Sequence, residues 1–326
     1  MSNPDPPRLG EFDLIRRHFA PLAKGVEAAL GLTDDAAVLT PTAGRQLVLT
    51  ADAMIAGVHF LADDPAADVG AKLLRVNLSD LAAMGAAPLG YLMTTAWPGD
   101  LSESWIADFA AGLAADQAEF GIGLLGGDTV STDGPLSLSL TAIGDLPAGT
   151  ALRRDGAKAG DLIYLSGRVG DAGVGLHLRQ DAIVVAEGED RAHAVERFHR
   201  PRPRLALGQA LRGLASACID VSDGLVADLG HLARASGVGA AVELARVPLS
   251  PLAGAIGGPA VAITAGDDYE LLFTVPTSAE ARMNQAVASA GVAIQCIGRI
   301  VAGADVAVVD GEGRPLELPS TGYRHF

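Results

Sequence analysis

Six aspartates stand where an apolar stretch of the sequence ends; they are Asp35, Asp52, Asp80, Asp128, Asp220 and Asp223. Each one alone is typical of a turn or a helix cap. If the six converged, their like charges would repel one another unless counter-charges lay between them. Hard divalent cations with oxygen ligands supply that charge, and Mg²⁺ favours a few carboxylates together with substrate phosphates. The pattern therefore predicts a site where several magnesium ions hold phosphate groups.

Glycine and arginine residues elsewhere favour phosphate as the ligand of this site. Gly126 and Gly127 precede Asp128, and their lack of side chains would let the backbone approach a phosphate closely. Arg153 and Arg154 are both candidates for a phosphate clamp, and the residues themselves do not choose between them.

Helices and strands must bring the aspartates together. Asp80 is expected near the end of a helix that closes with VNLSDLAAMGA, with Asp64 as the N-cap and Pro65 as the first helical residue. Asp35 is expected just before a short strand, and Asp52 at the end of the next strand. The remaining aspartates follow buried strands, so every member of the set lies at the end of an element.

Motifs of other nucleotide-binding and hydrolytic enzymes are missing or fail on their context. Residues 121–126, GIGLLG, match G-x-G-x-x-G, but they form an expected strand that leads into a Gly-Asp turn and not into a helix. This context excludes a dinucleotide fingerprint. The sequence has no Walker P-loop, no H-E-x-x-H and no nucleophile elbow.

Composition restricts the class of protein. The chain has 326 residues, 49% of them hydrophobic, and a net charge of −15. This acidity excludes a nucleic-acid partner, because phosphate would be repelled unless cations lay between. No apolar run approaches the ~20 residues of a membrane span. The N-terminus also lacks the pattern of a signal peptide, so a cytoplasmic protein with no membrane partner is expected.

Expected strands and helices alternate along both halves of the chain, which is the pattern of an α/β or α+β protein. A stretch rich in Gly and Ala, LPAGTALRRDGAKAG, separates the two halves. We therefore expect two domains, residues 1–148 and residues 149–326.

Six motifs occur in a fixed order: GEFDLI, DDAAV, VNLSDLAAMGA, GGDT, IDVSDGL and DDYELLFT. In this order they resemble the thiamine-monophosphate kinase family, part of the superfamily of aminoimidazole ribonucleotide synthetase-like ATP-binding proteins. The resemblance extends from Gly10 to Phe326. VNLSDLAAMGA and VSDGL indicate the superfamily, whereas GEFDLI, His59 within GVHF and the terminal GYRHF indicate the kinase.

The resemblance implies transfer of a phosphoryl group from ATP to thiamine phosphate, which gives thiamine diphosphate and ADP. It implies the two-domain fold of the superfamily in a homodimer. Residues 1–148 would bind ATP and magnesium and contribute strands to a barrel shared with a second copy. Residues 149–326 would complete an active-site cleft between the domains.

The resemblance also implies roles for individual residues. The magnesium ligands would be Asp35, Thr50, Ala51, Asp52, Asp80, Asp128, Asp220 and Asp223. ATP would contact Gly127, Arg154 and Ser222. Thiamine phosphate would contact His59, Asp267 and Tyr323. No catalytic residue is implied beyond these metal and phosphate ligands.

Three positions depart from the family pattern. Ala51 stands where a hydroxyl residue is common, so only its backbone carbonyl could bind a metal. Asp267 stands where Glu is common, which shortens its reach to the substrate by one methylene. Thr33 replaces a common Gly and has no evident consequence.

The chemistry of the acceptor is consistent with these roles. A phosphate monoester is mostly dianionic at neutral pH, with a second pKa of about 6, so it needs no strong general base. The difficulty is to bring two anionic groups together, and magnesium ions held by carboxylates solve it. We therefore expect direct in-line transfer without a phosphoenzyme. A Tyr323 ring beside the cationic thiazolium would add about 0.5–2 kcal/mol.

Simpler or different interpretations stay open for some features. His59 could be a core histidine bonded to backbone, and Tyr323 could only pack the C-terminal tail. Other ATP-using enzymes of the superfamily would need a reactive cysteine near the N-terminus or at the C-terminus, yet the first cysteine is Cys218 and the chain ends in GYRHF. A noncatalytic regulator that binds magnesium and nucleotide on the same fold is the alternative from another class.

Overall fold

The structure is a computed structural model that describes residues 10–323. These residues divide into two compact units, each described by itself below. Unit 1 comprises residues 10–78 and 88–145, and unit 2 comprises residues 79–87 and 146–323. The expected boundary after residue 148 stays a prediction. Of the terminal motif GYRHF, residues 324–326 lie outside the described residues.

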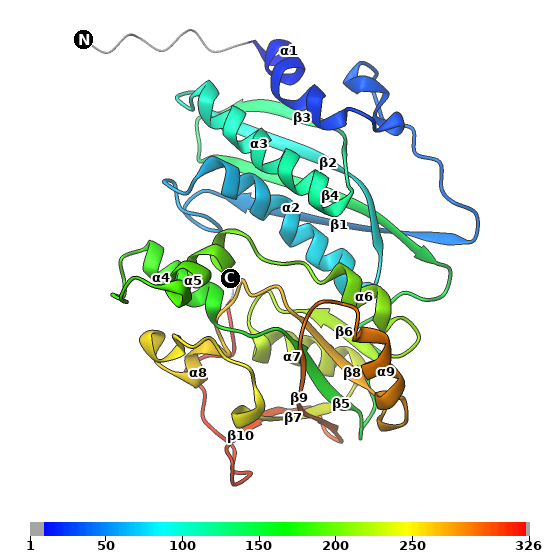
Figure 1. Ribbon diagram of the computed structural model, residues 1–326, viewed down its shortest axis with the longest axis vertical. Coiled ribbons are helices and arrows are strands. Elements are labelled where there is room, and N and C mark those ends of the chain that lie inside the picture. The colour runs from blue at the N-terminus through cyan, green and yellow to red at the C-terminus, as the bar shows by residue number, and fades with distance from the viewer. Residues whose placement is uncertain (1–9, 324–326) are drawn as a thin grey trace. The chain divides into compact units, whose positions relative to one another are not determined.

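Unit 1 is built on a four-stranded sheet in the order β1-β4-β2-β3, and two long helices run along one of its faces (Figure 1). The strands are β1 (Arg45–Ile55), β2 (Ala87–Pro98), β3 (Leu124–Thr132) and β4 (Ser137–Pro147). The two helices are α2 (Ala66–Ala83) and α3 (Glu103–Phe120). Leu73 and Leu81 of α2 are fully buried, which confirms the apolar pattern predicted for this helix. Residues 79–83 of the same helix fall in unit 2.

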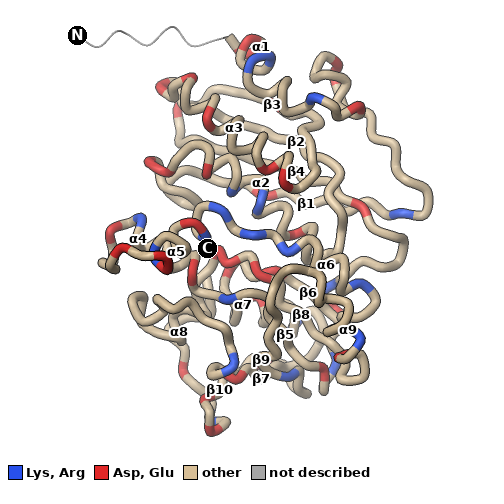
Figure 2. Tube along the Cα trace, in the orientation of Figure 1, with Lys and Arg blue, Asp and Glu red and all other residues tan. Residues whose placement is uncertain are grey.

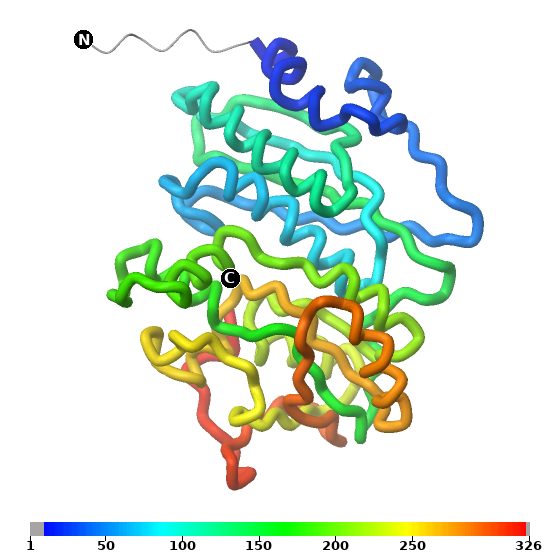
Figure 3. Tube along the Cα trace, viewed as in Figure 1, coloured from blue at the N-terminus to red at the C-terminus, as the bar shows by residue number. Residues whose placement is uncertain are grey.

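The N-terminal part of unit 1 is less regular than the sequence suggested. It contains α1 (Glu11–Leu14), the π-helix η1 (Ile15–Phe19) and the 3₁₀ turns η2 (Ala20–Ala23) and η3 (Glu27–Leu32). The short strand expected after Asp35 does not form, and residues 33–44 run without regular structure towards β1 (Figure 3). Val38 is 66% exposed there, and Pro41 has no N–H for a strand ladder.

Unit 2 is built on a six-stranded sheet in the order β10-β7-β9-β5-β8-β6. β10 pairs with β7 in parallel, whereas the other pairings are antiparallel. The strands are β5 (Leu162–Ser166), β6 (Ala217–Asp220), β7 (Gly239–Glu243), β8 (Leu271–Val275), β9 (Ile294–Val301) and β10 (Val306–Val309). Every residue of the inner strands β5 and β8 is buried, and so is every residue of β6, although β6 lies at the edge of the sheet.

Helices and short turns surround this sheet. The helices are α4 (Asp171–Arg179), α5 (Glu189–His199), α6 (Leu205–Leu211), α7 (Leu225–Ser236), α8 (Pro259–Ala262) and α9 (Glu280–Val287). α4 packs against α5, and α6 packs against α9. The 3₁₀ turns are η4 (Leu244–Arg246), η5 (Ala253–Ile256) and η6 (Thr277–Ala279).

Acidic positions are scattered through both units and form no single block (Figure 2). The negative charge of the chain is therefore not concentrated in a tail. Among residues 10–323, no helix is both long and apolar enough to span a bilayer.

Candidate active site

Asp80 and Asp220 come together in unit 2. Asp220 is the last residue of β6, and its side chain is buried. Ser79, which is fully buried on the last turn of α2, donates its hydroxyl to Asp220 Oδ2 at 2.7 Å. Asp80 follows Ser79 and is close enough for its charge to act on Asp220. The end of one helix and the end of one strand thus place Asp80 within electrostatic range of Asp220.

The electrostatics of this pair favour a cation. Burial, and then the negative charge of Asp80, raise the pKa of Asp220 to about 8. The Ser79 hydroxyl and the charge of Arg154 act in the opposite direction. A buried carboxylate that faces a second carboxylate is stabilised by a positive charge, and oxygen donors of this kind fit Mg²⁺. Among the described residues no three acidic, His or Cys side chains form a ready-made metal cluster.

The structure distinguishes Arg153 from Arg154, which the sequence made equal candidates for a phosphate clamp. Arg153 donates through Nε and Nη2 to Asp155 at 2.9 and 2.6 Å, which engages its guanidinium. The charge of Arg154 acts on Asp220, so its guanidinium belongs to the carboxylate pair's surroundings. Of the two arginines, Arg154 is therefore the one whose charge reaches Asp220.

The loop after β6 carries Ser222 and Asp223, and a residue that sequence reasoning missed fixes it. Asp228 Oδ2 accepts the backbone N–H groups of Ser222, Asp223 and Gly224 at 3.0, 3.0 and 3.2 Å. Burial, and then the charge of Asp223, raise the pKa of Asp228 to about 7. An acidic residue in the first turn of a helix after a glycine is the signal that could have identified it.

Asp267 and Tyr323 both contact this loop through their backbones. Asp267 N–H donates to Ser222 O at 2.8 Å, and Tyr323 N–H donates to Asp223 O at 2.9 Å. Tyr323 is 49% exposed and lines a cavity of about 860 Å³ together with Asp223. Asp267 and its neighbour Tyr269 have positive φ angles of 69° and 50°. Such a conformation costs a non-glycine residue about 1–2 kcal/mol, so the surrounding structure must offset it.

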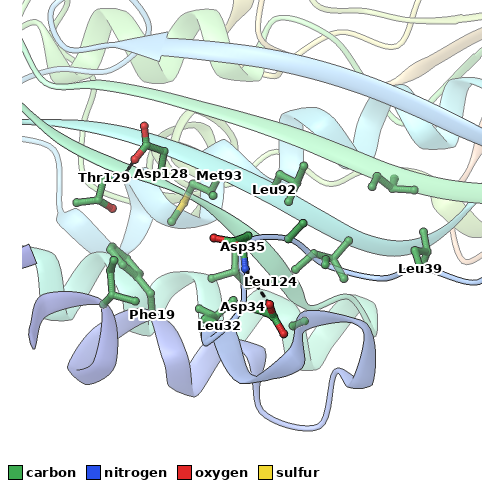
Figure 4. A pocket seen from close by; sticks show the side chains of 18 of the residues that line it. Phe19, Leu32, Asp34, Asp35, Leu39, Leu92, Met93, Leu124, Asp128 and Thr129 are labelled. Carbon is green, nitrogen blue, oxygen red and sulfur yellow. Dashed lines mark hydrogen bonds between the residues drawn. The ribbon is translucent and has the colours of Figure 1, made fainter. Parts of the chain in front are cut away.

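In unit 1, Asp35 and Asp128 line one pocket of about 500 Å³ (Figure 4). Asp128 comes from β3, and its Oδ1 accepts the N–H of Thr129 at 2.8 Å. Asp35 comes from the irregular segment after η3, where its N–H donates to Asp34 Oδ1 at 3.2 Å. Asp35 and Asp128 thus line the same pocket, but the Gly-Asp turn expected from the sequence is wrong, because Gly127 and Asp128 pair with β2 inside β3. His59 and Asp52 do not line this pocket.

Gly126 and Gly127 differ in what they permit. A Cβ on Gly127 would lie 1.8 Å from Met93 O of β2, and its φ is 154°. A Cβ on Gly126 would meet only Leu92 Cδ2, at an ordinary 3.5 Å. Gly127 is therefore required by the close approach of β2 and β3, which sets the position of Asp128.

Strand β1 carries Thr50, Ala51 and Asp52. Successive side chains of a strand point to opposite faces, so Thr50 and Asp52 share one face and Ala51 lies exposed on the other. Asp52 N–H donates to Asn77 Oδ1 at 3.1 Å, and Asp52 O accepts Ser139 Oγ at 3.2 Å. Sequence reasoning missed Asn77, although a fully buried polar residue in an apolar helix is a signal.

His59 lies in a turn that follows β1. Its Nδ1 accepts the N–H of Ile55 at 3.1 Å, which assigns the ring proton of the neutral form to Nε2. Lys72, buried on α2, donates Nζ to His59 O at 3.1 Å. This arrangement is that of a histidine bonded to backbone, so the simpler interpretation of His59 stays open.

Comparison with known proteins identifies the class to which this fold and these residues belong. Residues 33–146 match the family described as AIR synthase related protein, N-terminal domain, and residues 158–311 match AIR synthase related protein, C-terminal domain. The two-domain α/β fold of this class is therefore shown, with one matched domain for most of each unit.

Relatives identify the particular family. The chain is 43% identical to the thiamine-monophosphate kinase of Caulobacter vibrioides over 97% of this chain and 90% of that protein. The crystal structure of thiamine-monophosphate kinase from Stenotrophomonas maltophilia K279a is 43% identical, covers 94% of this chain and 98% of its own, and has a TM-score of 0.83. The structure of AaThiL complexed with AMPPCP and TMP is 30% identical, with a TM-score of 0.77 and coverage of 98% and 99%. The chain belongs to the thiamine-monophosphate kinase family of enzymes.

Proposed function

We propose that this enzyme transfers the terminal phosphoryl group of ATP directly to thiamine phosphate, with several Mg²⁺ ions and without a phosphoenzyme. The observation that carries the proposal is the pair formed by the buried Asp220 and the half-buried Asp80, whose like charges favour a cation beside the phosphates. The AaThiL complex with AMPPCP and TMP supports the choice of the two substrates.

The residues of the chain would act by binding and orienting. Asp35, Asp52, Asp80, Asp128, Asp220 and Asp223, with Thr50 and the Ala51 carbonyl, would hold magnesium. When bound, magnesium supplies charge that brings the two phosphates together and stabilises the transferring group. Gly127, Arg154 and Ser222 would bind ATP, and His59, Asp267 and Tyr323 would bind thiamine phosphate. No side chain needs to accept a proton, because the acceptor is already dianionic.

Product formation tests the proposal. Purified full-length protein with ATP, thiamine phosphate and Mg²⁺ should form thiamine diphosphate, measured by chromatography. A yield no higher than that of the no-enzyme control would overturn the proposed reaction. Labelled phosphate that becomes bound to the protein and then passes to the acceptor would overturn direct transfer.

Replacement of one carboxylate tests the metal site. Asp80→Asn keeps the size of the side chain and removes its charge, so we expect turnover to fall by orders of magnitude with an unchanged circular dichroism spectrum. Near-normal turnover would show that Asp80 is not an essential ligand.

Unit 1 also supports the homodimer. β1 is an edge strand, and Leu47 and Leu49 on it are 40% and 63% exposed. We expect a second copy to cover this strand, because long apolar edge strands are normally protected. Leu49→Glu should then halve the mass measured by light scattering. Val184→Glu, at a site 98% exposed in unit 2, is the matched control and should leave the mass unchanged.

A further inference from the structure

The segment before β8 is a strained turn that lies against the loop after β6. Asp267 and Tyr269 are both in the left-handed region, and Asp268 stands between them. Asp267 N–H donates to Ser222 O at 2.8 Å, and Tyr269 N–H donates to Val221 O at 2.7 Å. The direction of the Asp267 side chain therefore depends on keeping two unfavourable backbone conformations at once.

Asp268 is the residue between them, and it is 2% exposed. Its Oδ2 accepts the N–H of Gly170 at 2.8 Å, and its Oδ1 accepts the N–H groups of Gly170 and Ala172 at 3.0 and 3.4 Å. These donors form the N-terminus of α4, where a carboxylate is also favoured by the helix dipole. Asp268 thus ties the middle of the turn to a helix that is about 100 residues away in sequence.

Arg197 on α5 holds the same turn from its backbone side. Its Nη2 donates to Asp268 O at 2.9 Å and to Glu270 Oε1 at 3.1 Å. Glu270 also accepts Arg204 Nε at 2.7 Å and Ser166 Oγ at 2.5 Å. Loss of Arg197 would therefore loosen the turn without leaving Glu270 unpaired.

We propose that Asp268 and Arg197 are positioning residues for thiamine phosphate, an assignment that rests on the proposed function of Asp267. Both hold the turn from outside the substrate site. Without them the turn spends part of its time in the right-handed or extended conformations that L residues prefer. The apparent affinity for thiamine phosphate then falls in proportion to the fraction of molecules whose turn keeps the binding-competent conformation. Saturating thiamine phosphate restores the rate, because it selects these molecules.

The ATP side has a separate clamp, which provides a contrast variant. Asp228 accepts the N–H groups of Ser222, Asp223 and Gly224, whereas Asp268 accepts those of Gly170 and Ala172. Ser222 O also accepts the N–H of Asp267, so Asp228→Ala should raise the KM values for both substrates, whereas Asp268→Ala should raise mainly that for thiamine phosphate.

Steady-state kinetics of the full-length enzyme with Mg²⁺ test the proposal. Asp268→Ala and Arg197→Met should each raise the KM for thiamine phosphate about tenfold, which corresponds to about 1.4 kcal/mol. The KM for ATP and kcat should stay within about threefold. The proposal would be overturned if both KM values changed equally or if neither changed. It would also be overturned if Asp228→Ala raised the KM for thiamine phosphate alone. If Asp268→Ala does not fold, Arg197→Met decides the outcome.

Hydrogen exchange tests the same inference without catalysis. Peptides that contain Asp267–Glu270 should exchange faster in Asp268→Ala and Arg197→Met than in the wild type. Unchanged protection in both variants would overturn the positioning role. An inactive wild-type protein would instead refute the proposed function. The exchange result would then still show whether Asp268 and Arg197 hold the turn in place.

Discussion

The two neighbouring glycines of the GGDT motif allow a sharp test of how β2 and β3 position Asp128. Gly127→Ala places a Cβ 1.8 Å from Met93 O at a φ of 154°. An ordinary contact of about 3.4 Å would require the two strands to separate by roughly 1.5 Å. Overpacking costs about 1–3 kcal/mol and the strained backbone another 1–3 kcal/mol, so we expect a loss of roughly 2–6 kcal/mol in the free energy of unfolding.

The consequence for activity follows from the same displacement. Asp128 is the next residue, and a shift of about 1 Å in a site of this kind costs about a hundredfold in rate. Urea denaturation and kcat/KM for thiamine phosphate, both measured at saturating Mg²⁺, report the two effects. Gly126→Ala is the matched control, because its Cβ meets only a side-chain atom at 3.5 Å. If Gly127→Ala were as stable and as active as Gly126→Ala, the proposed strand geometry would be wrong.

Three further predictions concern charge. Ser79→Ala removes a hydrogen bond of 2.7 Å to the buried carboxylate of Asp220, and should lower the unfolding free energy measured in urea by about 1.5–3 kcal/mol; an unchanged value would mean the bond does not form. Asp116→Asn breaks the buried ion pair in which Arg75 Nε and Nη2 each donate to Asp116 at 2.7 Å. Thermal unfolding should show a loss of about 3–5 kcal/mol in the free energy of unfolding, while the KM values for ATP and thiamine phosphate stay constant. Removal of Mg²⁺ by EDTA should abolish turnover, and added Mg²⁺ should restore it; turnover without divalent cations would refute the role of the carboxylates.

Local patterns were sufficient to place Asp80 and Asp220 near the ends of their elements, whereas Asp52 and Asp128 lie inside β1 and β3. The apolar periodicity around Asp80 and the apolar run before Asp220 each indicate one element and its end, and the structure has α2 and β6 there. The prediction of a strand after Asp35 was wrong, because the apolar residues there have no neighbouring strand with which to pair. A strand needs a partner, and a short apolar run alone does not specify one.

The supporting residues could not be predicted in this way. Asp268 and Asn77 act on the backbone of segments that are distant in the sequence, namely Gly170 and Asp52. A backbone N–H is present at almost every residue, so its partner leaves no mark in composition or spacing. Such contacts become visible only when the chain is folded.

The two kinds of buried carboxylate in unit 2 show why charge alone did not identify the site. Glu270 is paired with Arg197 and Arg204, which neutralise it within the protein. Asp220 is instead held by the hydroxyl of Ser79, which orients the carboxylate without cancelling its charge, and it faces Asp80. A carboxylate fixed by a neutral donor keeps its attraction for an external cation, whereas one fixed by arginine loses most of it. The identity of the donor, and not the acidity of the residue, therefore separates the proposed metal ligand from the structural ion pair.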